Sequence, residues 1–486
     1  MDASNTKQCW ECRRRRLVCD FTRPECRKCQ LRGVACPGYD GKKPLKWLQP
    51  QQVNAKGPLK MAVPRAVKPE SERQMGSVLE AIEYYNIHIA PDLIATGARG
   101  PGTPYWMPHS TAPYLPRSFT QSIVCTSLCH RILQSSDAPP SDQVVLARKL
   151  QRHRGDALRA LTADLAQQEL QTSDFTLASI QQSFDPPSWR NHSTGAAAMI
   201  NMKGGFGNVI LSSPHLRHLF RYHALIEILG NTTSPNVELD SVRNQLGLIS
   251  LLPVLYGNGL ATCFPCPPDL LAEIIRINHL RSIFEAAACT STATKPAVRE
   301  GQQSAALDIL RRVRSFPTDK WAAEVVVGIS AGEDPAFEAG FTGWHDIACI
   351  YRSAIAIYCI SSLLHDNASG PCENTGVPGD PHLSPKQVLA KEREAYVSML
   401  VSRLRDVIEC THLRKLVLWP LFVAGAEVED ETTKRFVADE LRWISNALGT
   451  AAPLVAKDLL ENRVWALGLG RGSWGALFDQ SYVFVL

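Results

Sequence analysis

We expect the sequence to contain no apolar run long enough to cross a lipid bilayer. Its two longest candidates are short, because residues 246–256 include Pro253 and residues 354–364 follow Arg352 and include two serines. A membrane-spanning helix needs about 20 consecutive apolar residues. The first residues, MDASNTKQC, also lack the apolar core of a signal peptide. We therefore expect a soluble, intracellular protein with no membrane partner.

Charged residues are few, at 20% of 486, while hydrophobic residues make up 45%. This balance excludes a largely disordered or fibrous chain. The net charge of +5 is unevenly distributed: residues 1–74 contain 17 Lys/Arg and 7 Asp/Glu (net +10), and the rest contains 35 and 40 (net −5). A basic N-terminal segment on a mildly acidic body predicts a polyanionic partner for that segment alone.

Cysteine is sparse over most of the chain but dense near its beginning. Nine of the 15 cysteines are scattered, and the other six are Cys9, Cys12, Cys19, Cys26, Cys29 and Cys36. An odd total without a secretion signal argues against a disulfide framework. The six follow one spacing, C-x2-C-x6-C, written twice, which predicts metal binding.

The number of thiolates sets how many metal ions fit. Each half offers three, whereas tetrahedral zinc takes four ligands. Two Zn²⁺ ions complete the count if two sulfurs bridge, and the symmetric choice is Cys9 and Cys26. Six thiolates and two Zn²⁺ sum to −2, and residues 1–47 carry 12 Lys/Arg and 5 Asp/Glu, so the loaded module stays near +5. Metal binding would also supply the folding free energy of so short a segment.

The segment CWECRRRRLVCDFTRPECRKCQLRGVAC, residues 9–36, resembles the fungal zinc binuclear cluster (Zn2Cys6) transcription factors. Family members often carry a proline two residues before the fourth cysteine, where this chain has Pro24. The resemblance implies a short helix after each C-x2-C pair, the first of which enters the DNA major groove and reads a CGG-type triplet. The implied function is nuclear, zinc-dependent, sequence-specific regulation of RNA polymerase II transcription.

The two halves differ in the basic residues that would contact double-stranded DNA. Cys12 is followed by four arginines and Cys29 by Gln-Leu-Arg-Gly, so we expect the first half to read bases and the second to hold the backbone. Arginine can donate two hydrogen bonds to guanine. By resemblance, Arg15 and Arg16 approach base edges, while Arg13 is expected at phosphate. The expected DNA-contacting set is Arg13, Arg14, Arg15, Arg16, Arg27, Lys28 and Arg32.

The chain departs from the family pattern at two of these positions. The family commonly has lysine where this chain has Arg16 and a basic residue where it has Val18. Arginine keeps the charge but changes the geometry of the contact. The valine removes an expected phosphate contact.

Two alternatives stay open at this point. The run Arg13–Arg16 also fits a nuclear-import signal, so the chain could be a nuclear regulatory or scaffold protein whose zinc cluster is structural. Residues 328–332 (GISAG) match the G-x-S-x-G nucleophile elbow of hydrolases. No oxyanion motif precedes them and the alternating strands and helices of a hydrolase sheet are missing, so we expect no catalytic role.

The composition divides the chain into three parts. We expect a Zn2Cys6 DNA-binding domain at residues 5–40, a basic proline-rich flexible linker at 41–74 and an α-helical regulatory domain at 75–486. The linker prolines exclude a sustained coiled coil, and they are Pro44, Pro50, Pro58, Pro64 and Pro69. A homodimer or coregulator contact would then use residues 75–486.

Helical patterns dominate residues 75–486. Val78, Ile82 and Tyr85 follow the spacing of one helix face, and Ser384-Pro385-Lys386-Gln387 predicts a capped helix start. Ser141 is expected to cap another helix, which ends before a separate one around residues 158–165. Residues 324–329 (EVVVGI) and 482–486 predict strands.

Several of these segments resemble the fungus-specific transcription factor domain, which implies an α-helical scaffold that controls activity. They are residues 81–93, 188–205, 214–235, 264–281 and 350–364. The expected fold is therefore a small zinc-organised two-helix module plus a large, mainly α-helical regulatory domain.

Overall fold

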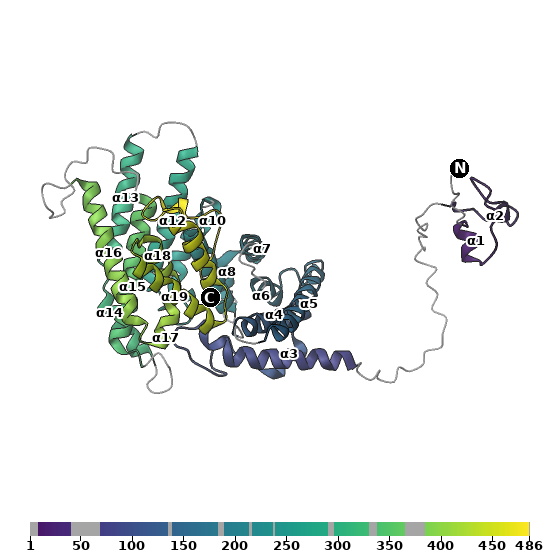
Figure 1. Ribbon diagram of the computed structural model, residues 1–486, viewed down its shortest axis with the longest axis horizontal. Coiled ribbons are helices and arrows are strands. Elements are labelled where there is room, and N and C mark those ends of the chain that lie inside the picture. Colours follow the sequence, from purple (N-terminus) through teal and green to yellow (C-terminus); the bar gives the residue numbers. More distant parts are fainter. Residues whose placement is uncertain are drawn as a thin grey trace. The chain divides into compact units, whose positions relative to one another are not determined.

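The computed structural model describes residues 8–39, 69–134, 139–182, 189–212, 216–236, 239–289, 296–329, 338–364 and 384–485. It divides into two compact units, Met1–Lys68 and Pro69–Leu486. The first unit contains two short helices and the second is built from helices, with no strand in either among the described residues (Figure 1). The expected fold class is confirmed.

The first unit contains α1 (Trp10–Arg14) and α2 (Arg27–Gln30). The longer helices of the second unit are α3 (Pro69–His88), α4 (Arg117–Gln134), α5 (Pro140–Leu165), α6 (Asp174–Gln182), α7 (Trp189–Met202), α8 (Gly205–Ser212), α9 (Arg217–Thr232), α10 (Leu239–Leu248), α12 (Pro268–Cys289), α13 (Pro296–Arg314), α14 (Thr318–Gly328), α15 (Gly340–Cys359), α16 (Pro385–Val407), α18 (Leu418–Glu427), α19 (Glu431–Leu448) and α20 (Ala452–Leu459). The shorter helical turns are η2 (Ala90–Leu93), η3 (His109–Tyr114), η5 (Ile249–Leu251), α11 (Leu252–Leu255), η7 (Ile360–Leu364), α17 (Thr411–Arg414), η8 (Lys415–Val417), η9 (Leu460–Trp465) and η10 (Trp474–Leu477).

The linker expected at residues 41–74 falls mostly on residues 40–68, which lie outside the described residues. The helix expected from Met75 begins earlier, because α3 starts at Pro69. Its predicted apolar face is confirmed. Val78, Ile82 and Tyr85 are all buried, in a small core that α3 shares with α4.

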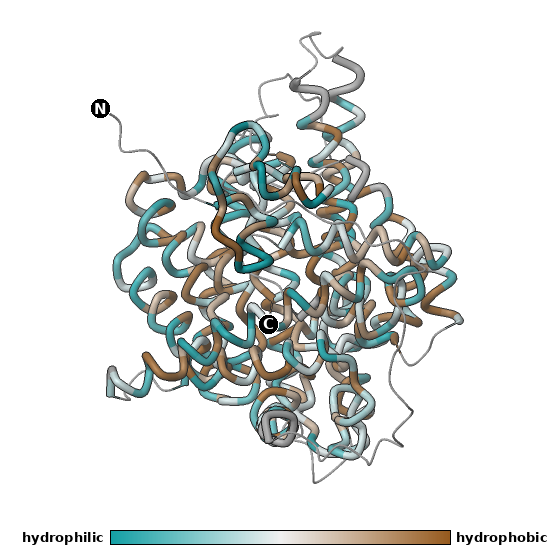
Figure 2. Tube along the Cα trace, turned by 90° about the vertical axis from the view of Figure 1, so that its right-hand side faces the viewer, coloured by the Kyte–Doolittle hydropathy of each residue, from teal (hydrophilic) through white to brown (hydrophobic). Residues whose placement is uncertain are grey.

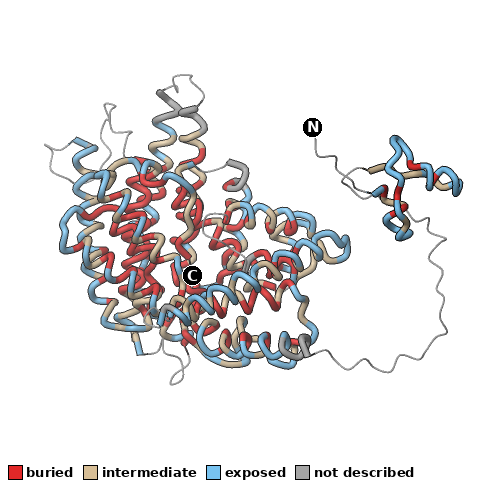
Figure 3. Tube along the Cα trace, turned by 45° about the vertical axis from the view of Figure 1, so that its right-hand side comes forward, coloured by how far each residue is buried: buried red, intermediate tan, exposed pale blue. Residues whose placement is uncertain are grey.

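Helix α15 is the centre of the second unit. From Ile347 to Cys359 every residue except Arg352 is buried, as expected of a helix that is apolar all round. It packs against α12, α13, α14, α16 and α18, and buried residues run through these helices in Figure 3. With η7 it spans Gly340–Leu364, which is long and apolar enough to cross a membrane by length and composition, a stretch that the sequence analysis underestimated. In the fold, 89% of its most apolar window is buried inside the unit.

Buried carboxylates tie the helices around α15 together. Glu427, at the end of α18, is 2% exposed, and Arg393 of α16 donates to both of its oxygens at 2.8 Å. Asp346 of α15 accepts a 2.8 Å hydrogen bond from Arg403, also of α16. Because a buried charge is costly unless it is paired, these pairs fix how α16 lies against α15 and α18.

A second buried polar feature, residues 231–234 (Asn-Thr-Thr-Ser), ends α9. All four residues are fully buried. The Trp419 indole donates to the Thr232 hydroxyl at 2.9 Å and the Trp474 indole to the Thr232 carbonyl at 2.6 Å. Arg281 donates to the Asn231 carbonyl at 3.1 Å. Backbone carbonyls left open by the end of α9 are thus satisfied from α12 and η10, and α18 contacts the Thr232 hydroxyl.

One local prediction is confirmed and two are wrong. The Ser384 cap and its Gln387 partner are both present, and Leu400, Leu404 and Val407 further along α16 are buried in the core. The strand predicted at residues 324–329 lies in α14, since burial of Val325 against the core outweighs the β preference of valine. Residues 482–485 also form no strand.

The interpretation of α5 is also corrected. The helix expected from Ser141 and the separate one expected further along are a single helix, and its N-cap is Pro139 rather than Ser141. Apolar residues of this helix such as Val145 and Leu158 are about half exposed, at 50% and 48%. Along the helices in general, hydrophilic and hydrophobic stretches alternate (Figure 2).

The α9 helix offers a test of the packing. A Cβ atom on Gly230 would overlap the Trp189 indole ring, whereas one on Gly247, in α10, would meet nothing within 4 Å. We expect Gly230→Ala to lower the free energy of unfolding by about 1–3 kcal/mol. Gly247→Ala should raise it by about 0.5–1 kcal/mol. Urea unfolding of both variants measures this, and equal effects would contradict the packing described.

Candidate metal centre and nucleic-acid interface

The first half of the cysteine repeat builds a helix start around one sulfur. Cys9 has the extended backbone of an N-cap residue (φ −61°, ψ 153°), and α1 begins at the next residue. Its Sγ accepts the backbone N–H of Cys12 at 3.4 Å, as an N-cap side chain does. The C-x2-C spacing therefore places both sulfurs at the same end of α1.

The second half repeats this geometry. Cys26 precedes α2 with φ −78° and ψ 139°, and its Sγ accepts the backbone N–H of Cys29 at 3.4 Å. The sequence repeat is thus a structural repeat, in which the first cysteine of each half caps a short helix.

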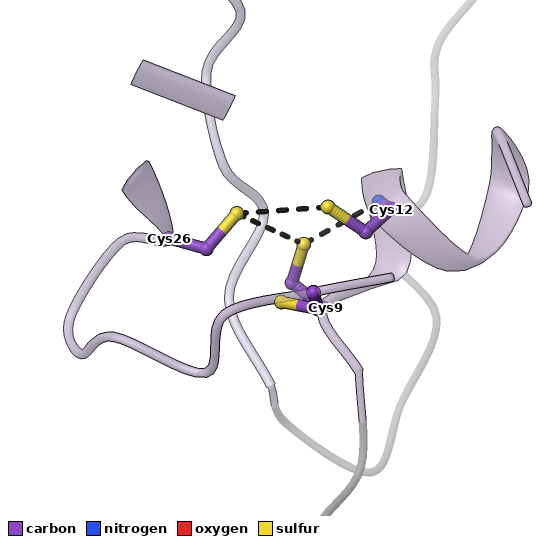
Figure 4. Close-up of side chains that lie close together, drawn as sticks. Cys9, Cys12 and Cys26 are labelled. Atoms are coloured by element: carbon purple, nitrogen blue, oxygen red, sulfur yellow. Dashed lines mark hydrogen bonds between the residues drawn. The ribbon is translucent and has the colours of Figure 1, made fainter. Parts of the chain in front are cut away.

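The two caps meet at the centre of the module. The Sγ atoms of Cys9 and Cys26 lie 3.6 Å apart, Cys12 lies 3.7 Å from Cys26, and Cys29 lies 3.9 Å from Cys9. Figure 4 shows the sulfurs of Cys9, Cys12 and Cys26 pointing toward one another. No sulfur is within bonding distance of another, and all six cysteines are free thiols.

The sulfurs form two sets of four, each with all members within 4.8 Å of one another. The first sulfur set is Cys9, Cys12, Cys19 and Cys26, and the second sulfur set is Cys9, Cys26, Cys29 and Cys36. Cys9 and Cys26 belong to both, and these are the residues that the ligand count singles out as bridges. A zinc ion with four Zn–S bonds of about 2.3 Å has ligands about 3.8 Å apart, which matches the sulfur separations of 3.6–3.9 Å.

The surroundings of the thiols affect their pKa values in opposite directions. Burial raises the pKa of Cys9 and raises that of Cys29 to about 12. For Cys19, burial acts to raise the pKa, but backbone hydrogen bonds from Cys9 and Phe21 help to prevail over it and lower the pKa to about 6. Binding of Zn²⁺ would displace the protons of the buried thiols and hold the six cysteine-bearing segments together.

Tyr39 is a contributor that the sequence analysis missed. Its hydroxyl lies 3.5 Å from Cys19 Sγ and donates to the Thr22 carbonyl at 2.9 Å. Arg23 lies over its ring, 5.3 Å from the centroid. The side chain thus joins the end of the module to the loop between its halves, and no spacing rule would have identified it.

All seven residues expected to contact DNA are exposed. The side chain of Arg13, within α1, folds back along the helix and places its guanidinium 5.3 Å from the centre of the Trp10 ring. Arg16 lies just after the helix. Its φ of +56° is in the left-handed region, which costs about 1–2 kcal/mol for a residue other than glycine.

The equivalent residue of the second half has the same left-handed backbone conformation. Four residues after the second cysteine, Arg16 stands in the first half and Gly33 in the second, and Gly33 has a φ of +62°. A residue with left-handed φ therefore follows each helix by two or three residues. Only the second half uses the residue that makes this turn without strain.

Glu11 is a second residue that the sequence analysis missed. Its carboxylate accepts hydrogen bonds from Arg14, and Arg15 Nε lies 2.6 Å from the same carboxylate. The hydrogen bonds from Arg14 lower the pKa of Glu11 to about 2, so it is an anion at neutral pH. Its spacing of three and four residues from two arginines could have indicated this.

The two units match different family models. Residues 7–46 match the fungal Zn(2)-Cys(6) binuclear cluster domain, and residues 80–466 match the fungal specific transcription factor domain. No solved structure matches the chain.

Curated relatives fall into two groups by coverage. Over its whole length the chain is 28% identical to a phomenoic acid biosynthesis cluster-specific transcriptional regulator of Leptosphaeria maculans, of which it covers 90%. Two other relatives match over short stretches. The chain is 41% identical over 49 residues to arginine metabolism regulation protein II of Saccharomyces cerevisiae (10% of this chain, 5% of the relative). It is 51% identical over 37 residues to acriflavine sensitivity control protein acr-2 of Neurospora crassa (8% of this chain, 6% of the relative).

Proposed function

The chain belongs to the fungal Zn(2)-Cys(6) transcription factor family, and from this we propose that it is a zinc-dependent, sequence-specific DNA-binding regulator of RNA polymerase II transcription. One observation carries the proposal. Two four-sulfur sets share Cys9 and Cys26 and thereby fix the start of α1, the helix that bears the arginine run.

We assign one Zn²⁺ to each sulfur set, with Cys9 and Cys26 bridging. Zinc supplies no redox chemistry and acts by holding segments together. The described residues 8–39 contain few buried apolar side chains besides the cysteines. The metal would therefore supply most of the folding free energy of this module.

DNA recognition is assigned to the first half. Arg15 and Arg16 lie where α1 ends and would reach base edges, with a CGG-type triplet as the target because arginine pairs with guanine O6 and N7. Retaining Arg16 in a strained backbone conformation, where the second half has glycine, supports a functional role. Arg13 and Arg14, with Arg27, Lys28 and Arg32 of the second half, would contact phosphates.

The helical unit is the proposed regulatory domain, which was expected at residues 75–486 and begins at Pro69 in the structure. A zinc module at residues 5–40 and a linker between the two complete the proposed organisation. Homodimer or coregulator contacts would use its surface, and the whole protein would act in the nucleus. Because the full-length relative is named as a regulator specific to a biosynthesis cluster, we extend the proposal to control of a biosynthetic gene cluster.

The sharing of two sulfurs predicts how ligand substitutions affect metal content. The full-length chain should hold about two zinc ions. Cys9→Ala removes a sulfur from both sets and should leave fewer than one, whereas Cys36→Ala affects only the second sulfur set and should leave about one. Atomic absorption measures the zinc content. The matched control is Cys129→Ala, which removes an exposed thiol of α4. One zinc per wild-type chain, or equal losses in both ligand variants, would overturn the assignment.

The left-handed conformation of Arg16 makes possible a variant that separates stability from recognition. Arg16→Gly should weaken binding of the full-length chain to a CGG duplex by about 1–3 kcal/mol, with little change on a scrambled duplex. Because glycine removes the backbone strain, zinc content and the unfolding temperature should not fall. Fluorescence anisotropy at fixed salt measures the two affinities.

Arg32→Ala is the matched control for this test. Arg32 is proposed to contact a phosphate. The variant should therefore lower the affinity for both duplexes equally and reduce the salt slope by about one. If wild type binds both duplexes equally and only in a salt-sensitive manner, the cluster is no sequence reader. The protein would then fit the alternative of a nuclear regulatory scaffold.

A further inference from the structure

The carboxylate of Glu11 stands in the middle of the arginine run. The residue lies in the first turn of α1, between Cys9 and Cys12, so the two sulfur sites fix its backbone at both sides. Its side chain is only 14% exposed. The carboxylate is therefore largely covered, and its partners are Arg14 and Arg15, the two arginines in the following turn.

Glu11 binds both neighbouring arginines through the Nε side of the guanidinium. Arg14 donates from Nε to Oε2 at 2.9 Å and from Nη2 to Oε1 at 2.6 Å. Arg15 Nε lies 2.6 Å from Oε1, and the Arg15 backbone N–H donates to the Glu11 carbonyl at 3.0 Å. A guanidinium has five N–H donors in a fixed fork. Contacts through Nε leave N–H groups at the far end of both side chains available for an end-on, bidentate contact.

The second half of the repeat provides an internal comparison. Lys28 occupies the position equivalent to Glu11, and Arg32 occupies the position equivalent to Arg15. No carboxylate contact to Arg32 is found among the described residues 8–39. In the half assigned to base reading, the carboxylate of Glu11 contacts Arg15. In the half assigned to the DNA backbone, the cationic Lys28 stands at the position equivalent to Glu11.

We propose that Glu11 is a positioning residue for base recognition: it orients Arg15 for end-on contact with guanine and lowers the charge available for sequence-blind contact with phosphates. The inference rests on the proposed function. A free arginine samples many rotamers, and fixing it before binding removes that entropic cost. An anion beside it also competes with phosphate, so Glu11 favours selectivity at the expense of sequence-blind affinity.

Glu11→Gln in the full-length, zinc-loaded chain tests this, with CGG and scrambled duplexes and anisotropy at several salt concentrations. The variant should bind the scrambled duplex more tightly, with a salt slope steeper by about one. Its preference for CGG over scrambled should fall at least about fivefold. Adding Arg14→Ala should remove the extra salt dependence, because Arg14 is one of the cations that Glu11 holds.

Glu25→Gln is the matched control, since it removes the same charge beside a zinc ligand and no cationic partner of Glu25 is found in the described part of this unit. It should leave the CGG preference unchanged. Glu11→Asp keeps the charge with a shorter reach, so it should keep the wild-type salt slope and lose part of the preference. Zinc content of every variant shows whether the module is folded.

The possible failures are distinguishable. If wild type prefers CGG but Glu11→Gln matches Glu25→Gln in preference and salt slope, Glu11 has only a structural role and the inference is wrong. If wild type shows no preference for CGG, that triplet is wrong, and the same variants are measured on the site that wild type selects from random DNA. If no site is selected, base reading fails together with the inference.

Discussion

A tetrahedral metal ion needs four donors, and each half of the N-terminal module supplies three. The shortage is met by sharing, because Cys9 and Cys26 belong to both four-sulfur sets. These two sulfurs also accept the backbone N–H groups that start α1 and α2. The helices therefore begin at the atoms that we assign to the metal, and a bound ion would fix where both helices start. A module this short has little else to hold its helices in place.

In the second unit, apolar burial and buried polar pairs hold the helices in place instead of sulfur ligands. Here a continuous apolar core surrounds α15, and buried polar groups determine which helices are neighbours. Arg393 reaches Glu427 and Arg403 reaches Asp346, so α16 is joined to both α18 and α15. Residues 231–234 do the same for the end of α9, where two tryptophan indoles and an arginine satisfy its polar groups. Apolar burial provides the stability of such a core, and the buried pairs favour one arrangement over others.

The features that could be predicted from the sequence are those set by residues close to one another along the chain. The cysteine spacing predicted the sulfur sharing because ligand number is a counting constraint, and the Ser384 cap was predictable because it involves four consecutive residues. The strand expected at residues 324–329 was wrong because burial against α15 determines the structure of that segment, and burial depends on residues distant in the sequence.

The periodicity of α5 was misread for a related reason: Val145 and Leu158 are apolar but half exposed. Polar groups such as Thr232, whose partners lie about 190 and 240 residues away, carry no sequence signal. Glu11 is a different case, since its spacing from Arg14 and Arg15 was visible and only its consequence was overlooked.

The internal repeat of the module also explains how one metal-binding unit comes to have two roles. The halves share their caps, their helix starts and even the left-handed turn four residues after the second cysteine. Differences at equivalent positions must therefore serve something other than metal binding. Two of those differences put Glu11 where the second half has Lys28 and Arg16 where it has Gly33, and both are unfavourable for attraction to phosphate or for the backbone. The carboxylate weakens attraction to phosphate, and the arginine strains the backbone. Neither would be expected in a half that only binds the DNA backbone, and this asymmetry is why we assign base recognition to the half that contains them.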